Sequence, residues 1–370
     1  MSSLGLIHDV VGRNPDTLWL AISLLFAFAI IATKFRQKQK EKASDQKCTK
    51  LDTLAKSSDD WKTFDWQSTP PRVLRPFKET YHITMAIQAD DVSNLITIDR
   101  DYLSRVQKRR QIIRDQGRRV HGCVPSGDNA VRELYSFLMK DFLPKRYPSI
   151  FALREDGSVI HNDVTDVDLP TEWTDSDAHG ALTALAETVE EDMFLLHETE
   201  DGHISDAFVC CFPSGFDPSQ KLGKLLRDIH GPVPSYEKIG SSMERFFSRL
   251  EVGKNVKRMN WSIQTHGELP AITGNHITEA DQSLRTAHDI KPEECFLRVE
   301  RQTLMRLPKT RAILFSFKTY LYPIPDIKAE GSGPQLADAI EGLKKGNAPG
   351  MWVYKGSAQW GERVCEYLRS

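Results

Sequence analysis

The spacing of apolar residues predicts several helices in the body of the chain. Residues 128–143 carry apolar side chains at steps of three and four, from Val131 to Phe142, which is typical of an amphipathic helix. Residues 181–196 and 238–250 show the same helical spacing, and residues 335–345 form a short predicted helix near the C-terminus.

Strands are expected mainly in the second half. Residues 205–212 and 311–322 are rich in Phe, Val, Ile, Leu and Tyr, which favour strands. Residues 155–180 are polar and acidic, as is typical of a surface loop. The predicted fold class is therefore α+β, with the strands concentrated in the second half of the body.

The longest uncharged apolar run covers residues 17–33, at the lower length limit for a membrane-spanning helix. Basic residues follow it from Lys34 to Lys42, so the positive-inside rule places the body in the cytosol. We expect a single-pass anchor, with the membrane as a partner and the endoplasmic reticulum as its location. A cleaved signal peptide and a buried or interfacial helix are the alternatives.

This pattern divides the chain into four expected parts. A tail (1–16) precedes the anchor (17–33), and a polar linker (34–70) leads to the body (71–370), which begins with an N-terminal extension. A stiff break at Ser68-Thr69-Pro70-Pro71 marks the end of the linker.

Composition excludes several classes of protein. The chain has 370 residues, with 49 Lys and Arg against 51 Asp and Glu, a balance that argues against a nucleic-acid partner. Six cysteines without a C-x-x-C pair indicate a reducing compartment. The sequence contains no G-x-G-x-x-G, Walker, H-E-x-x-H or G-x-S-x-G motif, so any redox chemistry needs electrons from outside this chain.

His230 is the first candidate for chemistry. It lies in Ile229-His230-Gly231-Pro232-Val233-Pro234, where two prolines restrict the backbone path and hold the imidazole in one direction. A fixed ring orientation suits a metal or haem ligand. A single histidine also commonly has a purely structural role, and that alternative stays open.

Two further segments mix charge with hydrogen-bonding groups. In Val256–Trp261, a strand would put Arg258 and Asn260 on one face and Trp261 on the other. In Leu297–Pro308, Glu300 lies between Arg298 and Arg301 in a potential ion-pair network that could bind propionates or an acidic substrate. An edge strand with a solvated arginine and a structural salt-bridge cluster are the alternatives.

Taken together, these segments resemble the α-subunit family of haem-dependent oxidative N-demethylases, including its fungal members. The resemblance covers about residues 70–360 and leaves the anchor outside. The matching stretches are Arg75–Lys78 with Thr84-Met85, Lys145–Pro148, Ile229–Pro234, Arg258 with Asn260-Trp261, Arg298–Pro308 and Tyr354-Lys355-Gly356.

The resemblance implies a PAS-like fold, an antiparallel sheet with flanking helices, that binds haem b. It places the axial iron ligand on His230 and a pocket arginine on Arg258. Arg258 and Glu300 are the expected catalytic residues. Asn260, Trp261, Arg301 and Gln302 join His230 and Arg258 as the expected residues around the cofactor.

The implied activity is oxidative removal of a methyl group from a small amine, with oxygen and with electrons from a separate flavin or iron–sulfur reductase. The expected substrate is a small amine or a biosynthetic metabolite. The alternative function is a non-enzymatic haem- or gas-binding PAS sensor, or an interaction module.

Overall fold

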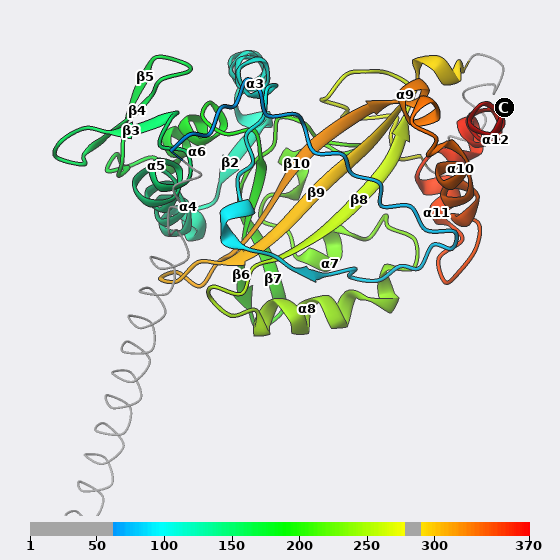
Figure 1. The fold of residues 1–370 in the computed structure, drawn as a ribbon. Coiled ribbons are helices and arrows are strands. Elements are labelled where there is room, and N and C mark those ends of the chain that lie inside the picture. Colours follow the sequence, from blue (N-terminus) through cyan, green and yellow to red (C-terminus); the bar gives the residue numbers. More distant parts are fainter. Residues whose placement is uncertain (1–61, 278–289) are drawn as a thin grey trace, which may run out of the picture. The chain divides into compact units, whose positions relative to one another are not determined.

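The structure is a computed structural model that describes residues 62–277 and 290–370 (Figure 1). Its centre is an antiparallel sheet with the strand order β1-β8-β9-β10-β6-β7-β2. The strands are β1 (Gln88–Ala89), β2 (His121–Cys123), β6 (Asp192–Thr199), β7 (Gly202–Val209), β8 (Val256–Gln264), β9 (Phe296–Arg306) and β10 (Ile313–Pro323).

The longest pairing joins β9 to β10. It runs from Ile313 opposite Arg306 to Pro323 opposite Phe296. On its other side β9 pairs with β8 from Val256 opposite Leu304 to Gln264 opposite Phe296. Because side chains alternate along a strand, this register decides which residues of the three strands share a face.

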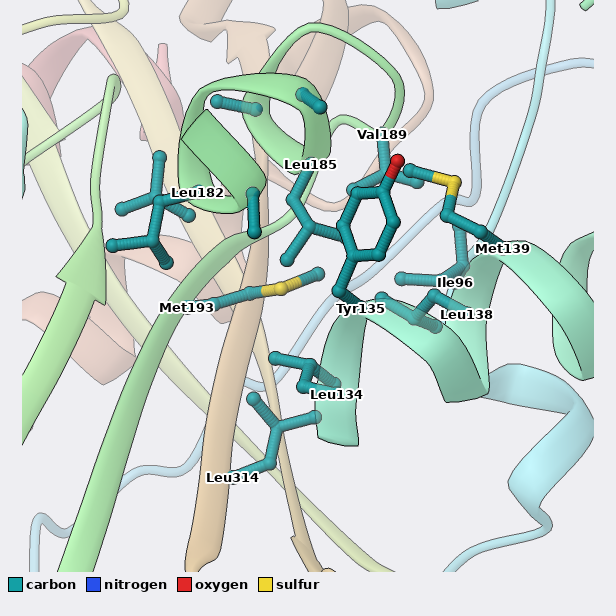
Figure 2. Close-up of a cluster of buried hydrophobic side chains, with 14 of the residues drawn as sticks. Ile96, Leu134, Tyr135, Leu138, Met139, Leu182, Leu185, Val189, Met193 and Leu314 are labelled. Atoms are coloured by element: carbon teal, nitrogen blue, oxygen red, sulfur yellow. The ribbon is translucent and has the colours of Figure 1, made fainter. Parts of the chain in front are cut away.

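One face of the sheet is covered by helices that hold the main core. These helices are α3 (Tyr102–Gln116), α4 (Asp128–Ser136), α5 (Leu143–Arg146) and α6 (Ala178–Ala186). A π-helical turn (Phe137–Phe142) joins α4 to α5. Figure 2 shows Leu134 and Tyr135 of α4 against Leu185 of α6, beside Met193 and Leu314 of the sheet. We call the face of the sheet that these helices cover the core face.

The C-terminal helices extend the core face toward β8. They are α9 (Ile324–Ala329), α10 (Gly333–Gly342), α11 (Met351–Tyr354) and α12 (Ser357–Arg369). Their apolar residues pack on Trp261, Val299 and Tyr320, which point to the same side of the sheet.

The opposite face is covered at one end by α7 (Leu226–Ile229) and α8 (Gly240–Arg249) (Figure 1). Met243 and Phe247 of α8 pack on Leu304 and Ile313 of the sheet. A second, smaller sheet consists of β3 (Phe151–Leu153), β4 (Val159–Asn162) and β5 (Val167–Pro170).

A buried lysine fastens the N-terminal part of the body to the core face. Lys318 of β10 is 3% exposed, and its Nζ donates to Asp99 Oδ2 and to Glu190 Oε1, both at 2.8 Å. It also donates to the Thr97 carbonyl at 2.7 Å. A buried charge needs such partners, because desolvation otherwise disfavours it strongly.

Most of the expected elements are present. The helix expected over 128–143 is α4 with the π-helical turn and α5, that over 238–250 is α8, and that over 335–345 corresponds to α10. Residues 205–212 and 311–322 match β7 and β10.

Two expectations were wrong. The helix expected over 181–196 ends at Ala186, and β6 begins at Asp192. Because Met193 to Leu196 are buried on both faces of the sheet, their apolar run carries no alternation that would identify a strand. The expected loop 155–180 contains β4 and β5, whose few inward residues give only a weak pattern.

The predicted membrane anchor and its location are corrected. In the part of the chain that the structure describes, no helix is long and apolar enough to cross a bilayer. The run 17–33 and most of the linker lie outside the described residues. The single-pass anchor, the membrane partner and the endoplasmic reticulum location therefore lack support. An α+β fold with antiparallel sheets is confirmed, but the implied PAS-like likeness is not supported.

Packed residues begin earlier than the expected body boundary at residue 71. The ring of Trp66 lies 6.2 Å from that of Tyr102, and Phe64 lies 5.0 Å from Tyr147. Both side chains pack against the main core.

Candidate functional site

Four of the expected site residues lie together on the face opposite the core face. Arg258 and Asn260 alternate along β8 and lie opposite Gln302 and Glu300 of β9. Residues directly opposite on neighbouring antiparallel strands have Cβ atoms about 5 Å apart. We call this the site face.

The site face becomes aromatic over β10, β6 and β7. Phe317 lies opposite Gln302, so the side chains of this face change from polar to apolar between β9 and β10. The rings of Phe194 and Phe317 are stacked at 6.5 Å, and those of Phe194 and Phe208 at 5.8 Å. Phe216, from the loop after β7, adds a ring 6.5 Å from Phe194. The polar residues therefore border an apolar wall suited to a flat ligand.

His230 follows the last residue of α7, and its ring is held on two sides. Its Nδ1 lies 2.8 Å from the Leu226 carbonyl, so this nitrogen donates and Nε2 is left as the acceptor. The ring stacks on Tyr236 at 5.0 Å with an interplanar angle of 6°. Burial lowers the pKa of His230, and the positive charges of Lys221 and Arg258 lower it further. A neutral imidazole with a free Nε2 is the form that binds a metal.

Arg258 is a half-buried cation without a full set of partners. Its Nε is buried and has no hydrogen-bond partner among the residues that the structure describes. Burial lowers the pKa of Arg258, while Tyr81 and Glu300 oppose that shift. An unsatisfied buried donor costs about 1–3 kcal/mol, so this guanidinium suits an anionic or hydrogen-bond-accepting ligand.

Glu300 is the carboxylate of the site face. It is 6% exposed. Gln302 Nε2 donates to its Oε2 at 3.0 Å and Asn260 Nδ2 to the same oxygen at 3.4 Å. Arg298 Nε donates to its Oε1 at 3.4 Å. The carboxylate is therefore oriented by three neighbouring side chains on the site face.

Two expected site residues lie elsewhere. Trp261 is on the core face, where it packs with the C-terminal helices. Arg301 also points away from the site face; its guanidinium pairs with Asp90 and donates to the Asn94 carbonyl at 2.8 Å. Trp261 and Arg301 lie on the opposite face because side chains alternate along a strand, and their neighbours Asn260, Glu300 and Gln302 are on the site face.

Sequence reasoning missed two groups near the site, the half-buried His276 and the buried Lys355. His276 stacks on Tyr354 at 4.3 Å, and burial, together with the charge of Lys355, lowers its pKa to about 3. No motif surrounds His276 in the sequence. Lys355 was noticed only as part of the Tyr354-Lys355-Gly356 resemblance, and its contact with Asn260 depends on the tertiary fold.

The donor set fits haem better than a bare metal ion. Among residues 62–277 and 290–370, no group of three or more His, Cys, Asp or Glu side chains could hold a metal ion. Haem needs one imidazole, an apolar wall for the ring and cations for its two carboxylates. His230, the aromatic wall and the orphaned Arg258 Nε supply these three features. Lys221 is a further cation whose Nζ donates to the Ile229 carbonyl at 3.1 Å.

Comparison with known protein families agrees with this chemistry. The family model described as haem-dependent oxidative N-demethylase, alpha subunit-like, matches residues 86–365, which is most of the chain. The match includes the strands of the site face, α7 with His230, and the segment that carries Lys355. The chain therefore belongs to the haem-dependent oxidative N-demethylase alpha subunit-like family.

Proposed function

We propose that this chain binds haem b through His230 and oxidises a C–H bond next to nitrogen in a small amine or related metabolite. The family name indicates haem dependence and oxidative N-demethylation. The observation that carries the assignment to this site is an oriented imidazole whose pKa is lowered by burial and by the charge of Arg258. The Nε of that half-buried arginine is itself unsatisfied, and the aromatic wall lies on the same face of the sheet.

The cofactor, when bound, would supply oxygen activation and the oxidising power. The chain's own residues would do the rest. The Leu226 carbonyl and the Tyr236 ring orient His230, so that Nε2 is presented in one direction. The aromatic wall excludes water, and a buried guanidinium next to it stabilises developing negative charge more strongly than in solvent.

Arg258 and Glu300 have different roles in this proposal. Arg258 would donate hydrogen bonds to an anionic group, such as a haem carboxylate. Glu300 holds or accepts a proton near the amine nitrogen, and Asn260 and Gln302 keep its oxygens in place. Electrons would come from a separate flavin or iron–sulfur reductase, since the sequence contains neither a dinucleotide motif nor a four-cysteine cluster spacing.

The test is haem binding by the full-length chain and by His230→Ala. Wild type should give a Soret band that shifts on reduction and again with carbon monoxide. His230→Ala should lose the iron ligand and most of the Soret absorbance. His203→Gln is the matched control, because His203 is also buried with its Nδ1 held, by Glu244 at 2.5 Å. Full Soret absorbance in His230→Ala would contradict the assignment of His230 as the iron ligand.

Turnover separates the enzyme from a binding module. With a chemical or enzymatic electron donor and an N-methylamine, the loaded wild type should consume oxygen and release formaldehyde. A protein that binds haem and carbon monoxide but never oxidises any amine offered would favour the alternative, a gas-binding module.

A further inference from the structure

Lys355 lies in the tight connection between α11 and α12. Its backbone N–H donates to the Met351 carbonyl at 3.0 Å, which closes the single turn of α11. Gly356 then takes a left-handed conformation (φ +75°), and α12 begins at Ser357. This reversal, which glycine adopts without penalty, turns the Lys355 side chain toward β8 instead of solvent.

The ammonium group of Lys355 is buried against β8 without a carboxylate partner. The residue is 3% exposed. Its Nζ donates to Asn260 Oδ1 at 3.1 Å and to the Trp261 carbonyl, and it lies 5.5 Å from the centre of the Trp261 ring. Among the described residues it forms no ion pair. Desolvation of this ammonium group destabilises the folded state, and a methionine of similar size would fill the same space without that penalty. A lysine at this position therefore needs a functional explanation.

The hydrogen bonds continue from Lys355 to Glu300. Because Asn260 Oδ1 accepts from Lys355, its Nδ2 is directed to Glu300 Oε2, where it donates at 3.4 Å. Lys355 therefore selects one of the two orientations of the Asn260 amide. The opposite orientation would put the amide oxygen against the Glu300 carboxylate and the amide NH₂ against the ammonium.

We propose that Lys355 is a positioning residue of the site: through Asn260 it holds Glu300 in place, and the hold weakens when the ammonium loses its charge. This inference rests on the proposed function only for the role of Glu300. A charged donor forms a hydrogen bond roughly twice as strong as a neutral one, so the loss of charge would loosen the amide without removing its contact.

The charged and titratable groups around Lys355 identify it as the one that changes in the mildly alkaline range. Burial lowers the pKa of Lys355 to about 8, with Glu300 opposing the shift and Arg258 adding to it. His276 stays neutral there, because its pKa is lowered to about 3. Tyr354 also stays neutral, because burial raises its pKa to about 12.

The first experiment uses carbon monoxide bound to the reduced, haem-loaded full chain as the probe. The C–O stretching frequency responds to nearby donors and charges, so wild type should show a shift with a midpoint near pH 8. Lys355→Met should abolish the shift. Lys355→Arg keeps charge and donor and should show no midpoint near pH 8, because a guanidinium stays protonated there. Lys344→Met is the matched control, because Lys344 also lies over a tryptophan (Trp352, 3.9 Å) and is not bonded to β8.

The second experiment needs no haem. The side-chain amide resonance of Asn260, assigned by its loss in Asn260→Asp, should shift in wild type with a midpoint near pH 8 and stay constant in Lys355→Met. Absence of that shift in wild type, or the same shift in Lys355→Met, overturns the proposal. Failure of wild type to bind haem would overturn the proposed function instead and leave this resonance test standing.

Discussion

The buried carboxylate of Asp192 links β6 to the segment that follows β7. Arg109 Nη1 donates to its Oδ1 at 2.5 Å, and the backbone N–H groups of Cys211 and Phe212 donate to its two oxygens at 2.8 Å. Both charged side chains are essentially inaccessible to solvent. This hydrogen-bond network extends to the site face, because Arg298 Nη2 of β9 donates to the Phe212 carbonyl at 2.5 Å.

Asp192→Asn should therefore be strongly destabilising. The change leaves the Arg109 guanidinium buried without a counter-charge, which typically costs about 3–5 kcal/mol. Urea unfolding monitored by circular dichroism measures the loss. Asp141→Asn is the control, because Asp141 pairs with Lys145 at the surface and such pairs contribute about 0.3–0.5 kcal/mol. Equal losses in the two variants would contradict the account of the buried pair.

The connection between α11 and α12 depends on a single glycine. Gly356 has a φ of +75°, and a Cβ at this position would lie 3.1 Å from Trp360 Nε1. Trp360 is itself 3% exposed and has little room to move. The conformation and the space around Gly356 both restrict this position to glycine.

Gly356→Ala should cost about 2 kcal/mol, from the left-handed conformation and the crowding of Trp360 together. Gly331→Ala provides the comparison, because Gly331 has a φ of +85° and a Cβ there would meet no atom within 4 Å. That variant should lose only about 1 kcal/mol. Chemical denaturation of both variants decides the point, and a loss at Gly356 no larger than at Gly331 would show that crowding is unimportant.

The elements that could be predicted from sequence are those with a clear period. α4 and α8 carry one apolar stripe, and β10 is a long apolar run. β9 was not predicted as a strand, because buried polar residues occupy both of its faces, with Glu300 on the site face and Arg301 on the opposite face. A strand pattern assumes one polar face in water, and that assumption fails where polar side chains are buried on both faces.

Within the site, alternation correctly put Arg258 and Asn260 on one face and Trp261 on the other. It also separates Glu300 from Arg301, although the sequence motif contains both. The contact of Lys355 with Asn260 spans 95 positions, and no local pattern predicts such a contact. Sequence motifs therefore pointed to segments that lie in β8 and β9, and only the pairing of distant segments shows how their side chains meet.

At the scale of the whole molecule, His276 lies where three distant parts of the chain meet. Its ring stacks on Tyr354, and the Ile277 N–H donates to the Tyr354 carbonyl at 3.1 Å. A Cβ on Gly215 would lie only 2.6 Å from His276 Nδ1, so the loop after β7 passes directly against this ring. The residue thus connects that loop, the segment after β8 and the C-terminal helices.

This position predicts a dependence of stability on acid. The pKa of His276 is about 3 in the folded protein and about 6.5 in an unfolded chain, so the unfolded state binds more protons between those values. The free energy of unfolding should therefore rise with pH from about 3 to about 6.5, by up to about 4–5 kcal/mol from this group. His276→Phe keeps the stacking and should flatten the curve of unfolding free energy against pH. Parallel curves for the two proteins would refute this.

The strict alternation along β8 and β9 also matters for protein engineering. A combinatorial library confined to positions 258 and 302 would vary the site face while every residue that faces the main core, and the Asn260 contact of Lys355, stay as they are. A library at the intervening positions would instead disrupt packing and the Arg301–Asp90 pair. Under the proposed function, the residues that would meet a ligand and those that hold the fold together thus occupy separate, interleaved positions.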